Sequence, residues 1–192
     1  LDTAAGVFTT NRVVAAPVVW SRRLLAGQED VQAGHARAVV LNSGSANACT
    51  GAQGLRDTEA TAARAAGLVS TEPDQVLVCS TGVIGERIDM PVLLEGIDIA
   101  ALALDDTPQA GTDAAAAIMT TDTVSKEDAL TVGTGEQSWT IGGMIKGVGM
   151  LAPGLATMLA VITTDAVLTP EQAQDTLASA TMRTVNRINS DG

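Results

Sequence analysis

The chain has 192 residues, a length that suits one domain or part of a larger protein. Hydrophobic residues make up 46% of the sequence and charged residues 17%, and no apolar run reaches the roughly 18 residues of a membrane-spanning helix, which excludes a disordered chain and a transmembrane segment. The formal net charge of −11 and the 2% of aromatic residues argue against binding to nucleic acid or to an anionic membrane, so small polar molecules are the expected partners.

The first half of the sequence contains two short β-branched runs, each followed by a loop of small residues. We predict strands at 36–42 and 75–79, which lead into NSGSANACTG and STGVIG. Between them, the alanine-rich segment 57–69 has acidic residues early and an arginine late. This pattern predicts a helix that is capped by Asp57.

The second half has its clearest local signal at Thr169, which is followed by a proline and, three residues on, by Gln172. This is the pattern of an N-cap, a first-turn proline and a capping-box partner, and it predicts a helix over 170–184. Strands and helices interleave, so the fold class is α/β or α+β. The other expected elements are helices at 91–104 and 108–119, buried strands at 138–145 and 157–164, and a hairpin turn at 133–135.

Cysteine and histidine are too few for several kinds of site. Cys49 and Cys79 are expected to be reduced and buried, and without a CxxC or Cys/His cluster we predict neither a disulfide framework nor a metal site. The single histidine, His35, is interpreted as a surface residue without a role in a loop before a strand. A nucleophilic mechanism would therefore need another base. No cofactor is expected.

A threonine at a new chain terminus can supply its own base, because its α-amino group has a pKa of about 7.7–8.0. The segment 146–160, KGVGMLAPGLATMLA, contains a candidate in Thr157. Its glycines and proline specify an irregular backbone, and the small Ala156 leaves the preceding carbonyl open to attack. The spacing alone favours an ordinary threonine at the start of a buried strand. Lys146 is either a partly desolvated ammonium for a carboxylate or a solvated turn lysine.

Several longer motifs carry a resemblance to a known family, and together they cover nearly the whole chain. They are AAGVFTTNRVVAAPV, LNSGSANACTG, STGVIGERI, IMTTDT, KGVGMLAPGLATMLAVITTDA and TVNRINSDG, in that order. In these motifs the sequence resembles the glutamate N-acetyltransferases of arginine biosynthesis, also called ornithine acetyltransferases.

The resemblance implies a self-cleaving enzyme of the N-terminal-nucleophile type, with two sheets between helical layers. The precursor would cut itself between Ala156 and Thr157, so that residues 1–156 form the first chain and 157–192 begin the second. Thr157 would then take the acetyl group from N-acetylornithine as an acetyl-threonine and pass it to glutamate.

The same resemblance assigns roles to further residues. Thr81 and Gly82 would form the oxyanion hole, although their spacing alone favours a simple strand-ending turn. Thr123 and Lys146 would contact the substrate, with Lys146 as the partner of its α-carboxylate. The loop 42–51 would lie near the active site, without a role for any single residue.

The family's second chain is long, and only 192 minus 156, or 36, residues of it are in this sequence. The remaining part of that β chain is therefore an expected partner, in a hetero-oligomer of cleaved chains. No secretion signal is visible, so the expected location is the cytoplasm. The alternatives are a paralogous acyltransferase or aminopeptidase on the same fold, or an inactive fragment that acts as a structural module. Whether acetyl-CoA is also a donor is left open by these motifs.

Overall fold

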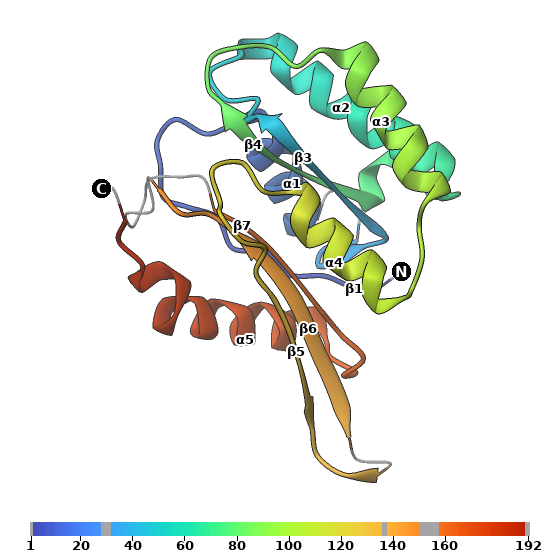
Figure 1. Ribbon diagram of the computed structural model, residues 1–192, viewed down its shortest axis with the longest axis vertical. Coiled ribbons are helices and arrows are strands. Elements are labelled where there is room, and N and C mark those ends of the chain that lie inside the picture. Colours follow the sequence, from blue (N-terminus) through green and yellow to red (C-terminus); the bar gives the residue numbers. More distant parts are fainter. Residues whose placement is uncertain (1, 28–31, 136–137, 150–157, 191–192) are drawn as a thin grey trace.

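Three small sheets and five α-helices make up the structure, a computed structural model that describes residues 2–27, 32–135, 138–149 and 158–190 (Figure 1). The helices are α1 (Ala16–Ala26), α2 (Gly51–Leu68), α3 (Met90–Leu102), α4 (Pro108–Ala117) and α5 (Pro170–Arg183), with short 3-10 helices at Pro73–Gln75 and Val185–Arg187. The strands are β1 (Asp2–Thr3), β2 (His35–Ala36), β3 (Ala38–Ser45), β4 (Val76–Val83), β5 (Glu127–Val132), β6 (Trp139–Lys146) and β7 (Leu159–Thr164).

Strands β3 and β4 form a parallel pair that α2 connects. The register runs from Ala38 opposite Val76 to Ser45 opposite Val83. Since the strands are parallel, their carboxyl ends lie at the same edge of the sheet, which brings the two small-residue loops together. The predicted strands at 36–42 and 75–79 are confirmed, with both extending further toward their carboxyl ends.

The main core lies where α1 and α2 pack on β4. It contains Leu24 of α1, Ala62 of α2 and Val76 of β4, all fully or almost fully buried. Side chains of α1 also close the outer edge of β4: Trp20 Nε1 donates to the Val76 carbonyl at 2.9 Å, and Ser21 Oγ donates to the Val78 carbonyl at 2.9 Å. This edge of the sheet is therefore satisfied by a helix rather than by a third strand.

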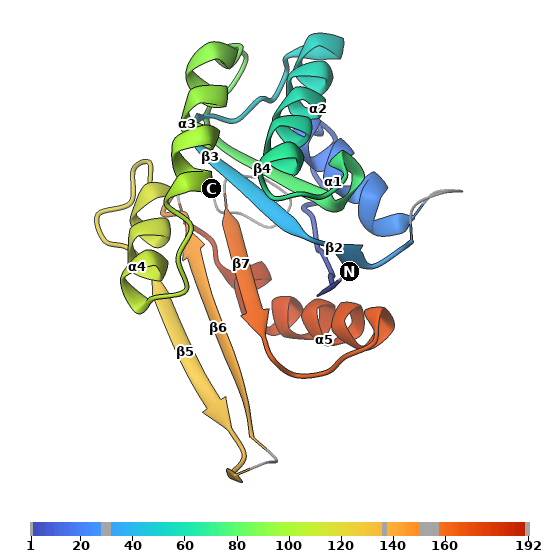
Figure 2. The ribbon, with the colours of Figure 1, turned by 90° about the vertical axis from the view of Figure 1, so that its right-hand side faces the viewer.

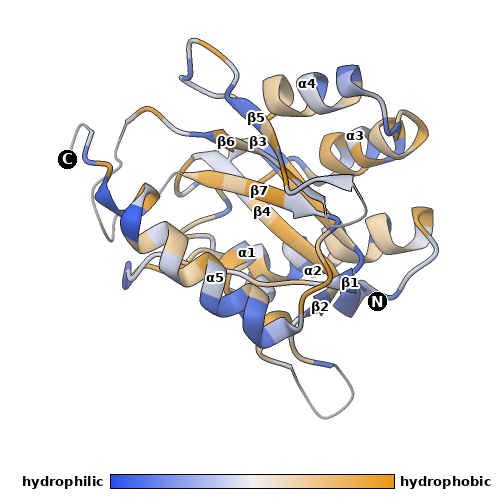
Figure 3. Cartoon of the chain, turned by 90° about the horizontal axis from the view of Figure 1, so that it is seen from below, coloured by the Kyte–Doolittle hydropathy of each residue, from blue (hydrophilic) through white to orange (hydrophobic). Residues whose placement is uncertain are grey.

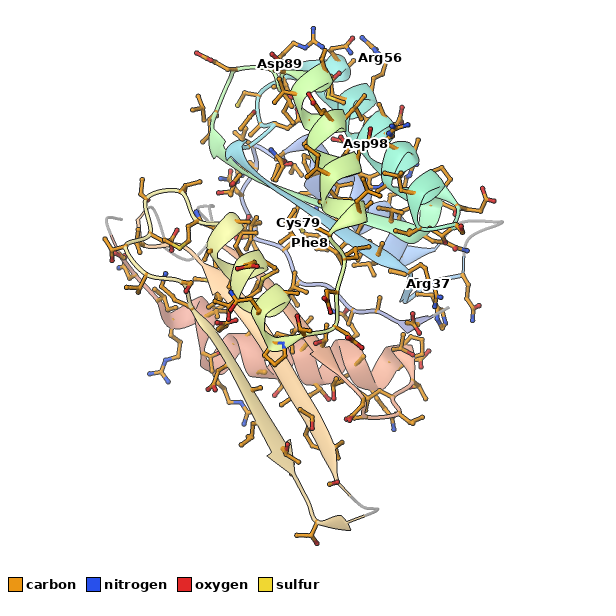
Figure 4. The ribbon with its side chains drawn as sticks, turned by 45° about the vertical axis from the view of Figure 1, so that its right-hand side comes forward. Phe8, Arg37, Arg56, Cys79, Asp89 and Asp98 are labelled. Atoms are coloured by element: carbon orange, nitrogen blue, oxygen red, sulfur yellow. The ribbon has the colours of Figure 1, made fainter. Side chains whose placement is uncertain are left out.

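Helix α3 packs on α2, and its Ile97 belongs to the same buried core cluster as Val76 of β4. An ion pair between Arg64 of α2 and Asp98 of α3 joins the two helices, and Figure 4 shows Asp98 between them. A groove of about 680 Å³ follows β3, with Leu93 and Ile97 of α3 among the residues that line it.

The antiparallel sheet of β5, β6 and β7 is much less buried. Its β5–β6 hairpin projects from the rest of the molecule, while α4 and α5 lie on either side of the sheet (Figure 2). Figure 3 shows the hydrophobic strands β4 and β7 in the middle of the molecule, and contacts between them join the two sheets. The mixed architecture of helices and sheets agrees with the predicted fold class.

Several local predictions are confirmed and others are wrong. The Thr169–Gln172 capping box forms at the start of α5 as predicted. The helix expected from residue 57 begins at Gly51 instead, because Asp57 is not a cap: it is buried inside α2 and pairs with Arg87. Helix α1 and strand β5 were not predicted.

Burial also differs from expectation at several places. The segments 138–145 and 157–164 were expected to be buried, but β6 is only partly covered and most of β7 is exposed. Both cysteines are free, as expected, yet Cys49 is exposed and Cys79 only half-buried. His35 belongs to β2 and its Nδ1 is buried, so it is not a surface loop residue.

Candidate functional site

Lys146 is a buried cation at the end of β6, with only 3% of its surface exposed. Its Nζ donates to Thr120 Oγ1 at 2.6 Å and to Thr81 Oγ1 at 3.3 Å, and it lies 3.5 Å from Asp122 Oδ2. An ammonium group has three donors, so these three oxygens match its hydrogen-bonding capacity. Thr81 comes from β4, whereas Thr120 and Asp122 lie in the segment between α4 and β5.

Asp122 is a buried carboxylate that two lysines share. Its Oδ1 accepts from Lys126 Nζ at 2.6 Å and from the backbone N–H of Gly147 at 2.8 Å, while Oδ2 accepts from the N–H of Thr120. Burial by itself raises the pKa of a carboxyl group. Here the hydrogen bonds, together with the charge of Lys146, outweigh that effect and hold the pKa of Asp122 well below its usual range. Asp122 is therefore ionised at neutral pH.

The cluster of Lys126, Lys146 and Asp122 has one net positive charge in a chain whose formal charge is −11. The sequence holds only two lysines, and both contact this one carboxylate. A net positive charge of this kind favours the binding of a small anion, for example a carboxylate.

Thr81 and Gly82 lie near the carboxyl end of β4, next to the lysine cluster. Thr81 is 1% exposed, and its hydroxyl oxygen accepts from Lys146. Within the part of the chain that the structure describes, the Thr81 hydroxyl proton has no acceptor. Gly82 has a φ of +131°, and a Cβ there would lie 2.3 Å from the carbonyl carbon of Gly44. Only glycine fits this close approach of two strands.

The loop 42–51 is held in place by a buried asparagine. Asn47 Nδ2 donates to the Gly54 carbonyl at 2.8 Å and to Thr58 Oγ1 at 3.0 Å, and Asn47 Oδ1 accepts from Thr50 Oγ1 at 2.7 Å. Asn47 itself has a positive φ of 48°. This network fixes the loop after β3 to the start of α2, which gives the loop a structural role that was not predicted.

The other predicted site residues are not all brought together. Thr123 is exposed and forms no hydrogen bond among the described residues, although it directly follows Asp122. Ala156 and Thr157 lie outside the described residues. The strand that begins two residues after Thr157 pairs with β6, so that Leu159 stands opposite Lys146.

Asp122, Thr120 and Lys126 were not predicted to belong to a site. The amino-acid composition holds the signal that could have found them. The sequence has nine arginines but only two lysines, of which one lies just after IMTTDT and the other begins the 146–160 segment.

In the described ranges, no three His, Cys, Asp or Glu side chains come close enough to hold a metal ion. Nor does any described helix have the length and apolarity to cross a membrane. Burial raises the pKa of the Cys79 thiol to about 11, so this thiol is not a nucleophile at neutral pH (Figure 4).

Comparisons with known proteins agree with one another. An "Arginine biosynthesis bifunctional protein ArgJ" of Bifidobacterium longum is 55% identical over 192 residues, which are 100% of this chain and 47% of that protein. The protein of the same name from Thermobifida fusca is 56% identical over 189 residues, 98% of this chain and 46% of that protein. The chain thus spans about half the length of the curated relatives it matches.

Solved structures show the same similarity. A crystal structure of ornithine acetyltransferase from Mycobacterium tuberculosis, in complex with ornithine, matches with a TM-score of 0.72 and 48% identity over 80% of this chain and 78% of that chain. The arginine biosynthesis bifunctional protein ArgJ of Bacillus halodurans matches with a TM-score of 0.67 and 35% identity over 81% of this chain and 78% of that chain. The sequence model of the ArgJ family matches residues 1–192 in full. This chain therefore belongs to the ArgJ family.

Proposed function

We propose that this chain is part of a self-cleaving acetyltransferase of arginine biosynthesis, which moves the acetyl group of N-acetylornithine to glutamate in the cytoplasm. The observation that carries the proposal is the buried contact between Lys146 and Thr81, in a chain that belongs to the ArgJ family. A relative of known structure is an ornithine acetyltransferase in complex with ornithine, which points to the substrate class.

Self-cleavage is the first proposed step. The Thr157 hydroxyl attacks the carbonyl carbon of Ala156, and the C–N bond breaks as the acyl group moves from nitrogen to oxygen. The hydroxyl proton ends on the released amine. Water then hydrolyses the ester, which leaves a carboxylate on Ala156 and a free α-amino group on Thr157. The products are a first chain that ends at Ala156 and a second chain that starts at Thr157 and includes the remaining β-chain residues.

Acetyl transfer is the second proposed step. The α-amino group of Thr157 takes the proton of its own hydroxyl, and the oxygen attacks the acetyl carbonyl of N-acetylornithine. Ornithine leaves as the amine and an acetyl-threonine ester remains. The amino group of glutamate then attacks that ester, which forms N-acetylglutamate and regenerates Thr157. Two half-reactions of this kind give ping-pong kinetics.

The charge that develops on the carbonyl oxygen in both steps needs hydrogen-bond donors. The Thr81 hydroxyl and the Gly82 N–H are the proposed donors, because the Thr81 proton has no acceptor among the described residues and Thr81 lies beside a buried ammonium. One such donor contributes about 2.7–4 kcal/mol to catalysis. The single positive charge of the lysine cluster matches the α-carboxylate that N-acetylornithine and glutamate share, and the exposed Thr123 is the proposed polar contact beside it.

The first test is the denatured mass of the full-length protein, combined with Thr157→Ala. The wild type should appear as two chains split between Ala156 and Thr157, and the variant as one uncut chain without acetyl transfer. Thr157→Ser should keep part of both activities, because it retains the nucleophile. Thr163→Ala, which removes an exposed hydroxyl on β7, is the matched control and should be cut normally.

Normal cleavage in Thr157→Ala would disprove the mechanism. The substrate is tested separately, by comparing N-acetylornithine with a small peptide amide and with acetyl-CoA as donors. Preference for the peptide amide would favour an aminopeptidase on the same fold. The absence of an acetyl adduct on Thr157 with every donor would favour an inactive structural module.

A further inference from the structure

The buried carboxylate of Asp122 has no part in the acetyl-transfer steps described above, yet it contacts every segment of the lysine cluster. It accepts from Lys126 in its own segment and from the N–H of Gly147 just after β6, and it lies 3.5 Å from the Lys146 ammonium. Its side chain is fully shielded from solvent. A carboxylate with this many partners in the interior constrains the position of each of them.

Lys146 depends on this carboxylate for its charge balance. Its other two partners, the hydroxyls of Thr120 and Thr81, are neutral and come from separate segments. A buried ammonium without a counter-ion is strongly disfavoured, so removal of the Asp122 charge should displace or neutralise Lys146. The hydroxyl of Thr81 would then lose the donor that fixes its orientation.

We propose that Asp122 is a positioning residue, which holds Lys146 so that the Thr81 hydroxyl proton is directed at the oxyanion of the reaction. The inference rests on the proposed function for the identity of that oxyanion. It assigns no contact with the substrate to Asp122, which acts through Lys146 and Thr81. Lys126 is the outer partner of the carboxylate, with its side chain about one third exposed.

Asp122→Asn in the full-length protein is the main test, because the amide has nearly the same shape but no charge. The kcat for acetyl transfer should fall by about 10²–10³, the effect of losing one oxyanion donor. KM should rise as well, because Lys146 belongs to the cluster proposed to bind the α-carboxylate, so the fall in kcat is the readout that reports on the oxyanion. Asp113→Asn, at an exposed carboxylate on α4 that accepts from Gln109, is the matched control and should leave both constants unchanged.

A second readout is independent of acetyl transfer. Acetic anhydride modifies exposed amines, and peptide mass spectrometry reports the modification of each lysine. In the wild type Lys126 should be modified much faster than Lys146, because Lys146 is buried and ion-paired. In Asp122→Asn the modification of Lys146 should accelerate, and in Asp113→Asn it should not. Lys126→Met retains the Asp122–Lys146 pair, so the modification of Lys146 in this variant should stay as slow as in the wild type.

Wild-type kcat in a folded Asp122→Asn variant would overturn the proposal, as would a rise in KM alone. If Asp122→Asn fails to fold by circular dichroism, Asp122→Glu takes its place: the longer side chain should shift Lys146 and lower kcat. A wild type that transfers no acetyl group would instead refute the proposed function. The modification rates of Lys146 would still decide whether Asp122 holds it, and unchanged rates in the variant would reject that role.

Discussion

The two sheets that meet at the candidate site differ strongly in how they are covered. β4 is packed under α1 and α2 and contributes Val76 and Val78 to the core, whereas every residue of β5 is exposed. Lys146, at the end of the less covered sheet, is nevertheless buried as deeply as the core. The site is therefore formed where one end of the exposed sheet is buried beside β4.

The two sheets therefore contribute differently: one mainly stabilises the fold, and the other mainly positions the residues of the site. Apolar burial on the β3–β4 side holds the fold, since that is where the hydrophobic core lies. On the β5–β7 side, buried polar contacts such as Lys146 with Asp122 hold the site. Substitutions in the two regions should consequently have distinct effects, and each of the following experiments tests that distinction.

The largest expected effect is that of Leu24→Ala in the full-length protein. Leu24 is 1% exposed in the core, and truncating such a leucine lowers the free energy of unfolding by about 2–5 kcal/mol. Leu130→Ala removes the same atoms from β5, where the residue is 61% exposed, and should change it by less than about 0.5 kcal/mol. Urea denaturation of both variants checks the pair, and equal losses would contradict the contrast between the sheets.

A smaller loss is expected for Ser21→Ala, which opens the edge of β4. Ser21 Oγ donates to the Val78 carbonyl and accepts from the Val78 N–H at 3.0 Å, so the variant leaves two buried backbone groups unpaired. The free energy of unfolding should fall by about 1–3 kcal/mol. Ser138→Ala, which removes an exposed hydroxyl bonded to the Gly135 carbonyl, is the control. The same urea series should detect almost no change for it.

The dependence of the free energy of unfolding on acid pH should report on the buried polar contacts of Asp122. The pKa of Asp122 is lowered by folding, so its contribution is present above the unfolded value of about 3.9 and is lost as the pH falls through the lower folded value. Unfolding measured at successive pH values below about 4 should thus be less pH-dependent in Asp122→Asn than in the wild type. Asp128→Asn, on exposed β5, should retain the wild-type slope.

Elements with local signals were predictable from the sequence. The capping box at Thr169 needs only residues within one helical turn, and it forms as expected. Asp57 failed as a predicted cap because its partner Arg87 lies 30 residues away, and such a long-range contact has no local signature. Helix α1 begins after Ala15, whose side chain cannot cap, and β5 has no buried face to give it an apolar alternation.

The candidate site was predictable only in part. Thr81 and Lys146 were expected at one site through the family resemblance, and the structure brings their side chains into contact. Asp122 was missed because its importance arises from burial among three segments, which no spacing in the sequence reveals. The position of Thr157 stays a prediction.

The hydrogen bond between Lys146 and Thr81 joins residues that are 65 positions apart. An unfolded or half-folded chain lacks this contact, because closing so long a loop is unfavourable until the sheets have formed. Under the proposed function, a newly synthesised chain could not cleave itself before its tertiary structure had formed. The presence of cleaved chains would then show that those molecules had folded to the native state.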